Sequence, residues 1–367
     1  MKLTIFQETL APLLADLLKC IPSRPQLPTL SCIYFEAKET QQLVLAATDL
    51  QFGMRITIEA KVSEPGKVAI PAKGFSELIN SLSPGKVELS HSENTLKVSA
   101  DGANAQMQTF KAEDYPVFPE KDGEALPLPL KLFGPAVQLT SFAASSDEAR
   151  PLLTALRIST DEQLEMVATD GFRLARIILP YEGDARTILL PSKAVSEAIR
   201  IASKKEQENV VFTVSEQLKQ AFVSFGNYEV VMRLLDGEYP PYQKILSNSY
   251  NTQVSFDTQE FLQKMKLASI FSRDSAGIVT LILAEDKLTI RSSSSSLGSQ
   301  ESTVNIQHIS GEPVEISFNS RYLQDFFSTV KPERVWLGVN ESLKPAAFRP
   351  EGMAEYTYIV MPFRVNQ

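Results

Sequence analysis

Two aspartates occupy the positions with the clearest potential for chemistry, because the same Ala-Thr pair precedes both Asp49 and Asp170. A carboxylate at a repeated position could act as a general acid or base, which requires a second titratable group within hydrogen-bond reach. The sequence offers no such pair beside either aspartate. An aspartate between two apolar runs is typical of a tight strand connection, in which the carboxylate accepts backbone N–H groups. We therefore interpret both residues as structural, and keep an enzyme with a site around them as an alternative.

The remaining reactive side chains fit no catalytic or metal-binding pattern. His91 and His308 are the only histidines, so a three-histidine zinc site is impossible and a histidine-based triad has little support. Cys20 and Cys32 match no metal motif and are expected to be buried, reduced and structural. The sequence also lacks a phosphate-binding P-loop, a dinucleotide fingerprint and a nucleophile elbow. We predict no cofactor, no metal and no catalytic activity.

Composition describes an ordinary folded protein. The chain has 367 residues, of which 43% are hydrophobic and 22% charged, with a net charge of −8. That charge argues against general adhesion to nucleic acid but does not exclude a local basic surface. No stretch approaches the roughly 20 apolar residues that cross a bilayer, and Glu8 stands where a signal peptide would be apolar. We predict a cytoplasmic protein.

The elements that must position these residues repeat along the chain. Residues 47–56 return as 168–177, residues 70–79 return as 190–199, and 318–327 is a weaker third copy. The offset from Asp49 to Asp170 is 121 residues, which is the size of a whole domain. The tags Asp-Tyr-Pro and Glu-Tyr-Pro, centred on Tyr115 and Tyr239, precede boundary-like stretches at 119–129 and 246–253. These signals predict three similar domains, covering residues 1–125, 126–248 and 249–367.

Each third shows the same order of hydrophobic periodicities, with two helices and several alternating, antiparallel-type strands. Helices are expected at 9–20, 71–82, 134–145, 192–204, 258–271 and 320–330. Strands are expected at 3–6, 32–35, 43–47, 52–60, 87–90, 96–100, 105–110, 155–159, 164–168, 173–179, 210–214, 221–225, 229–235, 279–283, 288–291, 335–339, 346–349 and 356–363. Because helices do not alternate one-for-one with strands, the pattern indicates an α+β fold.

Basic residues lie on or beside the predicted helices, while acidic residues are more plentiful elsewhere. For any single lysine, the solvated face of an amphipathic helix is a sufficient explanation. Together the basic residues permit a cationic lining that would attract phosphates without reading bases. The candidates for DNA contact are Arg24, Lys73, Lys193, Arg200 and Lys204.

Four segments carry a family resemblance: ATDGFRL at 168–174, LDGEYP at 235–240, FNSRY at 318–322 and YIVMPFRV at 358–365. They occur in this order over a threefold repeat, together with Arg24 in Ser-Arg-Pro. On these segments the whole chain resembles the bacterial DNA polymerase III beta subunit, the replicative sliding clamp. The resemblance implies a head-to-tail homodimer whose six domains close a ring around double-stranded DNA. Such a ring holds DNA topologically, without regard to sequence, and confers processivity without catalysis.

The resemblance also implies a pocket between the second and third domains for short linear motifs of the polymerase, the clamp loader and repair proteins. Apolar walls there would accept leucine or phenylalanine anchors, and arginines would take polar groups. Its residues would be Arg150, Leu153, Thr169, Gly171, Phe172, Arg173, Leu174, Pro240, Ile245, Asn319, Tyr322, Met361, Pro362, Phe363 and Arg364. Phe172 stands where the family often has histidine, so we expect a more apolar rim of the pocket. Asn366 and Gln367 run past the family's usual last residue and could crowd the pocket.

For the ring joint, the resemblance points to Ala105 and Met107 of one chain facing Ile270 and Phe271 of the other. Residues in a helix stripe are more often core than interface. A monomeric peptide-binding scaffold that never encircles DNA stays the alternative, since it would share the pocket but not the closed dimer.

Overall fold

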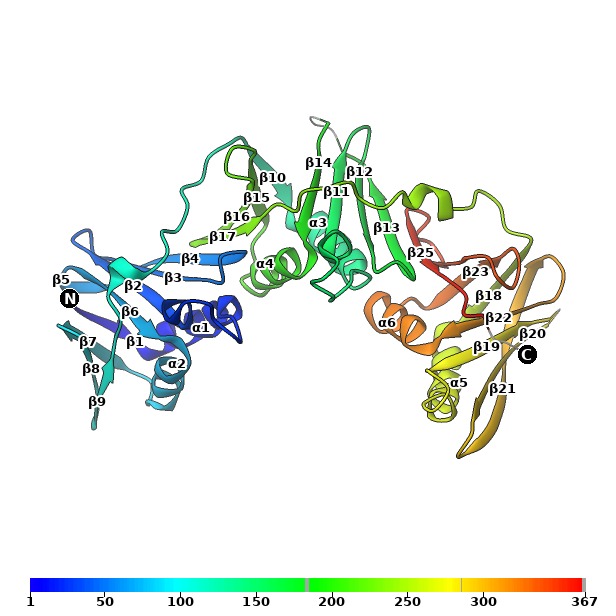
Figure 1. The fold of residues 1–367 in the computed structure, drawn as a ribbon, viewed down its shortest axis with the longest axis horizontal. Helices are drawn as coiled ribbons and strands as arrows, with labels where there is room; N and C mark the ends of the chain where they lie inside the picture. Colours follow the sequence, from blue (N-terminus) through cyan, green and yellow to red (C-terminus); the bar gives the residue numbers. More distant parts are fainter. Residues whose placement is uncertain (182–184, 285, 365–367) are drawn as a thin grey trace. The chain divides into compact units, whose positions relative to one another are not determined.

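The computed structural model describes residues 1–181, 185–284 and 286–364 (Figure 1). The chain packs as two compact units, the first made of Met1–Phe133 with Glu197–Leu234 and the second of Gly134–Ser196 with Leu235–Gln367. The middle third of the chain thus contributes to both units.

The first unit contains a small antiparallel sheet beside two helices. α1 (Gln7–Leu17) and α2 (Ala72–Ser81) bury apolar stripes that include Leu14 and Phe75. The strand order is β5 (Lys61–Glu64), β1 (Lys2–Phe6), β7 (Lys86–Ser92), β8 (Thr95–Ala100) and β9 (Ala103–Gln108). β9 is an edge strand, because its only partner among the described strands is β8.

The larger sheet of the first unit joins strands from the first and middle thirds of the chain. β4 pairs with β17 from Ile56 opposite Tyr228 to Phe52 opposite Met232. Among the described residues the order is β10 (Ala125–Pro129), β15 (Asn209–Ser215), β16 (Gln220–Phe225), β17 (Tyr228–Arg233), β4 (Phe52–Glu59), β3 (Gln42–Thr48), β2 (Cys32–Lys38) and β6 (Gly66–Pro71).

The second unit is built in the same way, since β13 of the middle third pairs with β25 of the last third, from Ile177 opposite Tyr356 to Arg173 opposite Val360. As far as the structure is described, its strand order is β14 (Thr187–Pro191), β11 (Ala155–Thr160), β12 (Leu164–Thr169), β13 (Arg173–Leu179), β25 (Tyr356–Val360), β24 (Ala346–Pro350), β23 (Arg334–Val339), β18 (Thr252–Asp257), β21 (Gly298–Ser310), β20 (Lys287–Ser294), β19 (Ile278–Leu283) and β22 (Val314–Asn319).

All six predicted helices are present in the described ranges, and with antiparallel sheets throughout they confirm the α+β class. The remaining four are α3 (Leu130–Ser141), α4 (Ser192–Lys204), α5 (Thr258–Phe271) and α6 (Ser320–Val330). The predicted start of α3 at Gly134 is wrong, because Gly134 and Pro135 lie inside the helix. The predicted start of α2 at Pro71 is one residue early, since Pro71 is its N-cap and the last residue of β6.

Several strands escaped the sequence analysis, namely β5, β6, β10, β14, β18, β21 and β22. β10 lies in the stretch at 119–129 that we took for a linker, and it contains Pro127 and Pro129. Proline removes a backbone donor and is tolerated in sheets mainly on edge strands. β10 is such an edge, because it pairs with β15 alone among the described strands.

The interpretation of the two repeated aspartates as turn residues is confirmed. The Oδ1 atom of Asp49 accepts hydrogen bonds from the N–H groups two and three residues on, at 2.8 and 2.7 Å. Asp170 does the same, at 2.8 and 2.9 Å. Each aspartate therefore closes the connection between two antiparallel strands, β3 to β4 and β12 to β13.

The other candidate chemistry gains no support from the described residues. Cys20 and Cys32 are free and buried, and burial raises the pKa of the Cys32 thiol to about 11. No group of three potential metal ligands occurs among them, and no described helix is long and apolar enough to cross a membrane. His91 contacts Thr109 through Nε2 at 3.1 Å. The side chain of His308 lies outside the described residues.

Candidate peptide-binding site

The turn between β12 and β13 presents Phe172 to solvent. Thr169 fixes the turn, since its Oγ1 donates to the Arg173 carbonyl at 2.6 Å and accepts from the Gly171 N–H at 3.0 Å. Gly171 has a φ of +93°, a left-handed conformation that glycine adopts without steric conflict. The Phe172 side chain at the tip is 56% exposed. An exposed aromatic ring on a rigid turn is a suitable apolar contact for a partner.

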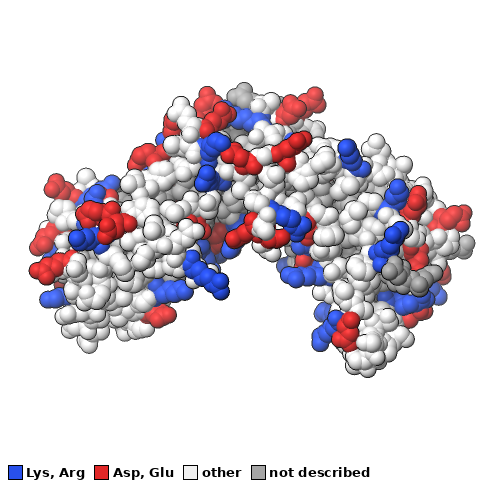
Figure 2. Space-filling model, in the orientation of Figure 1, with Lys and Arg blue, Asp and Glu red and all other residues white. Residues whose placement is uncertain are grey.

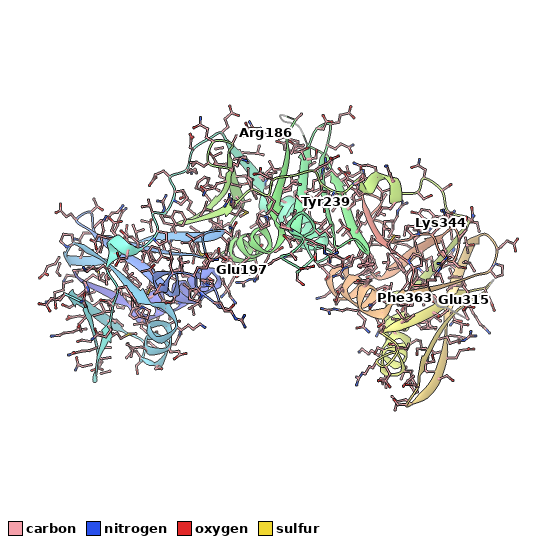
Figure 3. All side chains as sticks on the ribbon, in the orientation of Figure 1. Arg186, Glu197, Tyr239, Glu315, Lys344 and Phe363 are labelled. Carbon is pink, nitrogen blue, oxygen red and sulfur yellow. The ribbon has the colours of Figure 1, made fainter. Side chains whose placement is uncertain are left out.

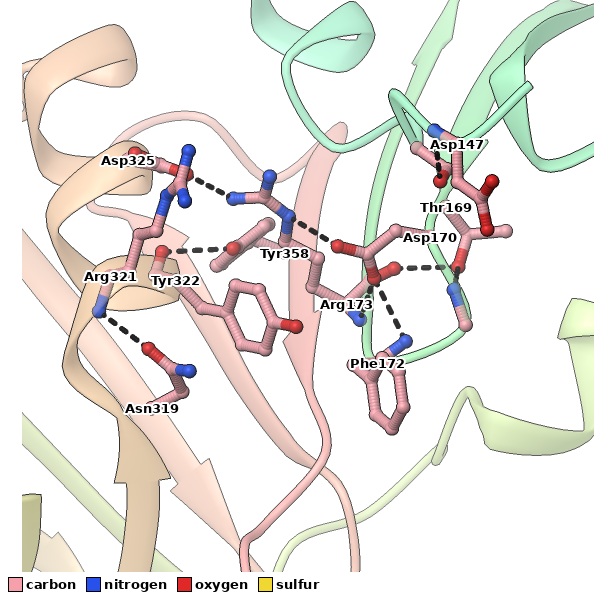
Figure 4. Close-up of polar contacts among 12 residues, drawn as sticks. Asp147, Thr169, Asp170, Phe172, Arg173, Asn319, Arg321, Tyr322, Asp325 and Tyr358 are labelled. Carbon is pink, nitrogen blue, oxygen red and sulfur yellow. Dashed lines mark hydrogen bonds and ion pairs between the residues drawn. The ribbon is translucent and has the colours of Figure 1, made fainter. Parts of the chain in front are cut away.

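Arg173 connects this turn to α6 (Figure 4). Its Nε donates to Asp170 at 3.0 Å and its Nη1 donates to Asp325 of α6 at 2.6 Å. The guanidinium also lies 4.9 Å from the centre of the Tyr322 ring, and its side chain is only 10% exposed. Two carboxylates already compensate its charge, so Arg173 positions the walls of the site instead of offering a free cation.

The C-terminal segment runs along the same turn. After β25, the Met361 N–H donates to the Phe172 carbonyl at 2.8 Å, and the Phe363 N–H donates to the Ser317 carbonyl of β22 at 2.7 Å. Met361 and Pro362 are half-buried, whereas Arg364 and Phe363 (Figure 3) are exposed. These two hydrogen bonds hold the segment between the β13 turn and β22. Residues 365–367, including the Asn366-Gln367 extension, lie outside the described residues.

A third side is formed by the segment that follows β17. Its 3₁₀ turn, Tyr242–Ile245, packs on a buried cluster that contains Leu174 and Ile359. The carbonyl of Pro240, which lies two residues before the turn, accepts the Tyr242 N–H at 2.7 Å. Because Leu174 is fully buried, it supports the site from below and is not part of its surface.

The other predicted residues surround the turn. Leu153 lies 3.9 Å from where a Cβ on Gly171 would stand. Arg150 is exposed and pairs with Asp147 at 3.0 Å. Asn319 is the N-cap of α6, where its side chain accepts the Arg321 N–H at 2.9 Å, and the Tyr322 carbonyl accepts the Tyr358 hydroxyl at 2.9 Å (Figure 4). All the predicted peptide-binding residues thus belong to the second unit, although no direct contact joins Arg150 or Asn319 to the Phe172 turn among those described.

The sequence analysis missed a charged network that anchors the 3₁₀ turn. Glu165 on β12 accepts hydrogen bonds from Tyr242, from Arg157 at 2.9 Å and from Arg176 at 2.6 Å. Burial alone would raise the pKa of Glu165, but the hydrogen bond from Tyr242 and the two arginines outweigh it and lower the pKa. The repeat contained a signal for this network, because Arg176 follows Arg55 by the same 121 residues that separate the two aspartates.

The predicted DNA-contacting residues are all exposed. Arg24 follows the 3₁₀ turn after α1, Lys73 lies on α2, and Lys193, Arg200 and Lys204 lie on α4. Arg200 pairs with Glu197 at 2.7 Å, one turn earlier on the helix, which reduces its free charge. Lysine and arginine are interspersed with aspartate and glutamate on the face shown in Figure 2, and basic side chains stand out around α1 and α2.

The four predicted interface residues lie on two elements with free surface. Ala105 and Met107 are half-buried on the edge strand β9. Ile270 is 41% exposed and Phe271 is half-buried at the end of α5. Partly exposed apolar side chains at a sheet edge and a helix end are compatible with surfaces that a second subunit covers.

The comparisons with known proteins agree along the whole chain. Three family models match in order: the DNA polymerase III beta subunit N-terminal domain at residues 1–119, its central domain at 127–241 and its C-terminal domain at 243–364. The beta sliding clamps of Staphylococcus aureus and Staphylococcus epidermidis are each 28% identical to this chain, over 99% of both lengths.

Solved structures show the same fold. The DNA polymerase III subunit beta of Pseudomonas aeruginosa has a TM-score of 0.91 at 25% identity, and the beta sliding clamp of C. crescentus has 0.91 at 26%, each over 100% of both chains. The beta subunit of Thermotoga maritima has a TM-score of 0.92 at 24% identity. With three domain models matched in sequence order, the chain belongs to the DNA polymerase III beta subunit family.

Proposed function

We propose that this chain is a DNA sliding clamp that encircles duplex DNA as a head-to-tail homodimer and tethers polymerases to it, without catalysis. The observation that carries the proposal is the ordered match of all three beta-subunit domains along one chain. We keep 1–125, 126–248 and 249–367 as the three domains, and place the protein in the cytoplasm, where bacterial DNA is replicated.

Free strand edges support the closed dimer. β9 of the first unit has one unpaired edge. In the second unit, residues 298–304 of β21 pair with β20 on one side only, as far as the strands are described. Exposed strand edges readily add a strand from another chain. Pairing β9 of one chain with β21 of its partner would make a heterologous contact, and two such contacts would close a ring.

The charge distribution suits a ring that slides. A net charge of −8 opposes tight general binding to DNA, while Lys73, Lys193 and Lys204 on helices remain exposed. Each phosphate that a protein neutralises strengthens binding and makes it more sensitive to salt. With few phosphate contacts, the ring would therefore stay on DNA because it encircles the duplex, and it could still move along it.

The peptide site gives the clamp its partners. Phe172 and Phe363 offer exposed apolar rings, and Met361, with a flexible thioether, accommodates varied anchors. Arg364 is exposed and available for the polar groups of a linear motif, whereas Arg150, also exposed, would first have to exchange its pairing with Asp147. We propose that C-terminal or internal segments of polymerases, the clamp loader and repair proteins bind here.

The decisive experiment is to load the protein onto nicked circular DNA with a clamp loader and then cut the circle once. We expect the protein to remain on circles during gel filtration and to leave the linear DNA within minutes. Retention on linear DNA with free ends would contradict topological binding. A chain that stays monomeric in analytical ultracentrifugation at micromolar concentration would favour a peptide-binding scaffold.

A further inference from the structure

The first unit contains a cavity at the junction of β4 and β17 that the proposed function does not use. Its volume is about 100 Å³. The turn between β3 and β4 contributes Leu50 and Gln51, the segment before β10 contributes Val117 and Phe118, and β17 contributes Val231 and Arg233 to its lining. For scale, an apolar cavity of about 150 Å³ accommodates a benzene ring. This smaller cavity, whose lining mixes Leu50 and Val231 with the polar Gln220 and Arg233, has room for a single aliphatic side chain beside a polar group.

The backbone around this cavity repeats that of the candidate peptide-binding site. The Arg233 N–H donates to the Gln51 carbonyl at 2.9 Å, as the Met361 N–H donates to the Phe172 carbonyl at 2.8 Å. Gln51 and Phe172 are separated by the repeat offset of 121 residues, from Asp49 to Asp170. Arg233 therefore occupies the position that Met361 has in the candidate peptide-binding site. We call the β4–β17 pairing, between the first and middle thirds of the chain, the first joint. The β13–β25 pairing, between the middle and last thirds, is the second joint.

The turn residue differs between the two joints in an informative way. Where the second site has Gly171, the cavity has Leu50, which has a φ of +76° and is 48% exposed. A non-glycine residue in the left-handed region is strained, and such strain persists mainly at functional positions. Folding alone does not explain an exposed leucine in this conformation. Glycine would remove the backbone strain, and no core packing would be lost because the Leu50 side chain is already at the surface.

The walls of the cavity are formed in advance. The ring of Phe118 lies 4.9 Å from the Arg55 guanidinium, and Arg55 pairs with Glu229 of β17 at 2.6 Å. Val117 beside it is 93% exposed. The Phe118 ring held against Arg55, next to an exposed valine, gives an entering side chain an apolar contact.

The charge at the rim selects the ligand. Arg233 is exposed and makes no ion pair among the described residues. No aspartate or glutamate lines the cavity, and the Asp49 carboxylate is already bonded to the backbone of its own turn. An unpaired guanidinium binds a carboxylate through charge-assisted hydrogen bonds, whereas Met361 at the second joint offers no charge.

We propose that this cavity is a second peptide-anchoring site, which binds an extended segment of a partner protein carrying an aliphatic side chain next to a carboxylate. The inference rests on the proposed function, since it takes the second joint as the model of a peptide site. The different side chains at Leu50 and Arg233 give the two joints different ligand preferences, so each chain of the clamp can hold two different partners at once.

The test is a methyl NMR titration of the full-length protein with three pentapeptides. The probe is acetyl-Ser-Glu-Leu-Glu-Ser-amide, and the controls replace both glutamates by lysine or the leucine by glycine. We expect the probe to shift the methyl signals of Leu50, Val117 and Val231, and each control to bind at least tenfold more weakly. Arg233→Glu should reverse the preference between the glutamate and lysine peptides.

Leu50→Gly separates binding from folding. The variant should have the same melting temperature as the wild type or a higher one, and its affinity for the probe peptide should be at least tenfold lower. An unchanged affinity in this variant, or shifts confined to Leu153, Leu174 and Ile359 at the second joint, would overturn the inference. A C-terminal peptide of the cognate polymerase, titrated in parallel, tests the second joint separately. If the polymerase peptide fails to bind, the proposed peptide site is contradicted. If it binds but the acidic probe does not, only the first-joint site is contradicted.

Discussion

At the scale of single residues, Arg173 and Asp170 show how a turn becomes a wall of the candidate site. Asp170 accepts two backbone N–H groups and pairs with Arg173, which in turn reaches Asp325 on α6. The sequence motif correctly marked this turn, and its structural reading of Asp170 is confirmed. The sequence could not reveal Asp325, since a partner 152 residues away is defined only by packing.

Asp170→Ala should lower the free energy of unfolding of the second unit by about 2 kcal/mol, the range expected for hydrogen bonds to a charged acceptor. Asp170→Asn is the matched control, because its amide oxygen can still accept the two N–H groups. Its loss of unfolding free energy should be less than half that of Asp170→Ala. Urea unfolding followed by tryptophan fluorescence measures both, since Trp336 lies in this unit. Equal losses would contradict the role of the backbone hydrogen bonds.

Glu165 should make the second unit sensitive to acid. Its pKa in the folded state is lowered from 4.5, so the folded state favours the carboxylate more than the unfolded chain does. The stabilisation is therefore complete above about pH 4.5 and is lost as the pH falls through the folded pKa.

Glu165→Gln isolates this effect. The variant should be less stable than the wild type at pH 7, because Arg157 and Arg176 lose their charged partner, and the difference should shrink steadily from pH 5 to pH 3. Urea midpoints at four pH values test this expectation. A difference that is independent of pH would show that Glu165 does not titrate in this range.

At the scale of elements, the sequence predicted the helices well and the strands unevenly. The amphipathic stripes of α4, α5 and α6 placed those helices at the bounds found in the structure. β10 was missed because two prolines suggested a linker, and β21 because most of its residues are polar and Val304 is its one fully buried hydrophobic residue among those whose side chains are described. Strand pairing depends on neighbours distant in sequence, so edges of this kind are poorly marked by local composition.

The C-terminal segment is the element that most directly tests the peptide site. Deletion of residues 361–367 removes Phe363 and the two backbone hydrogen bonds that hold the segment along the Phe172 turn. We expect loss of binding to a fluorescent polymerase C-terminal peptide in an anisotropy titration, with the homodimer intact. Truncation after Arg364 is the control and should bind with near-normal affinity. Undiminished binding in the larger deletion would place the peptide elsewhere.

At the scale of the whole molecule, the proposed ring depends on the surface of β9. Met107→Glu places a charge in the expected contact with the partner subunit and should weaken the homodimer at least a hundredfold, because burying an unpaired charge is strongly unfavourable. Gln108→Glu adds the same charge at the next, exposed position of the strand and should have little effect. Sedimentation velocity across a concentration series measures both. Equal behaviour of the two variants would exclude this face of β9 from the interface.

The paired strands at the two joints also have a mechanical consequence. β4 with β17, and β13 with β25, are each linked by backbone hydrogen bonds along five residue pairs, and the peptide chain continues past each joint. Tension applied around a closed ring would be shared at these joints by a hydrogen-bonded ladder and a covalent tether. In the proposed ring the boundary between subunits would have no covalent tether, so it would be the weakest link under load. A loading machine that pulls on the ring would therefore open it there first, and the domains within each chain would stay joined.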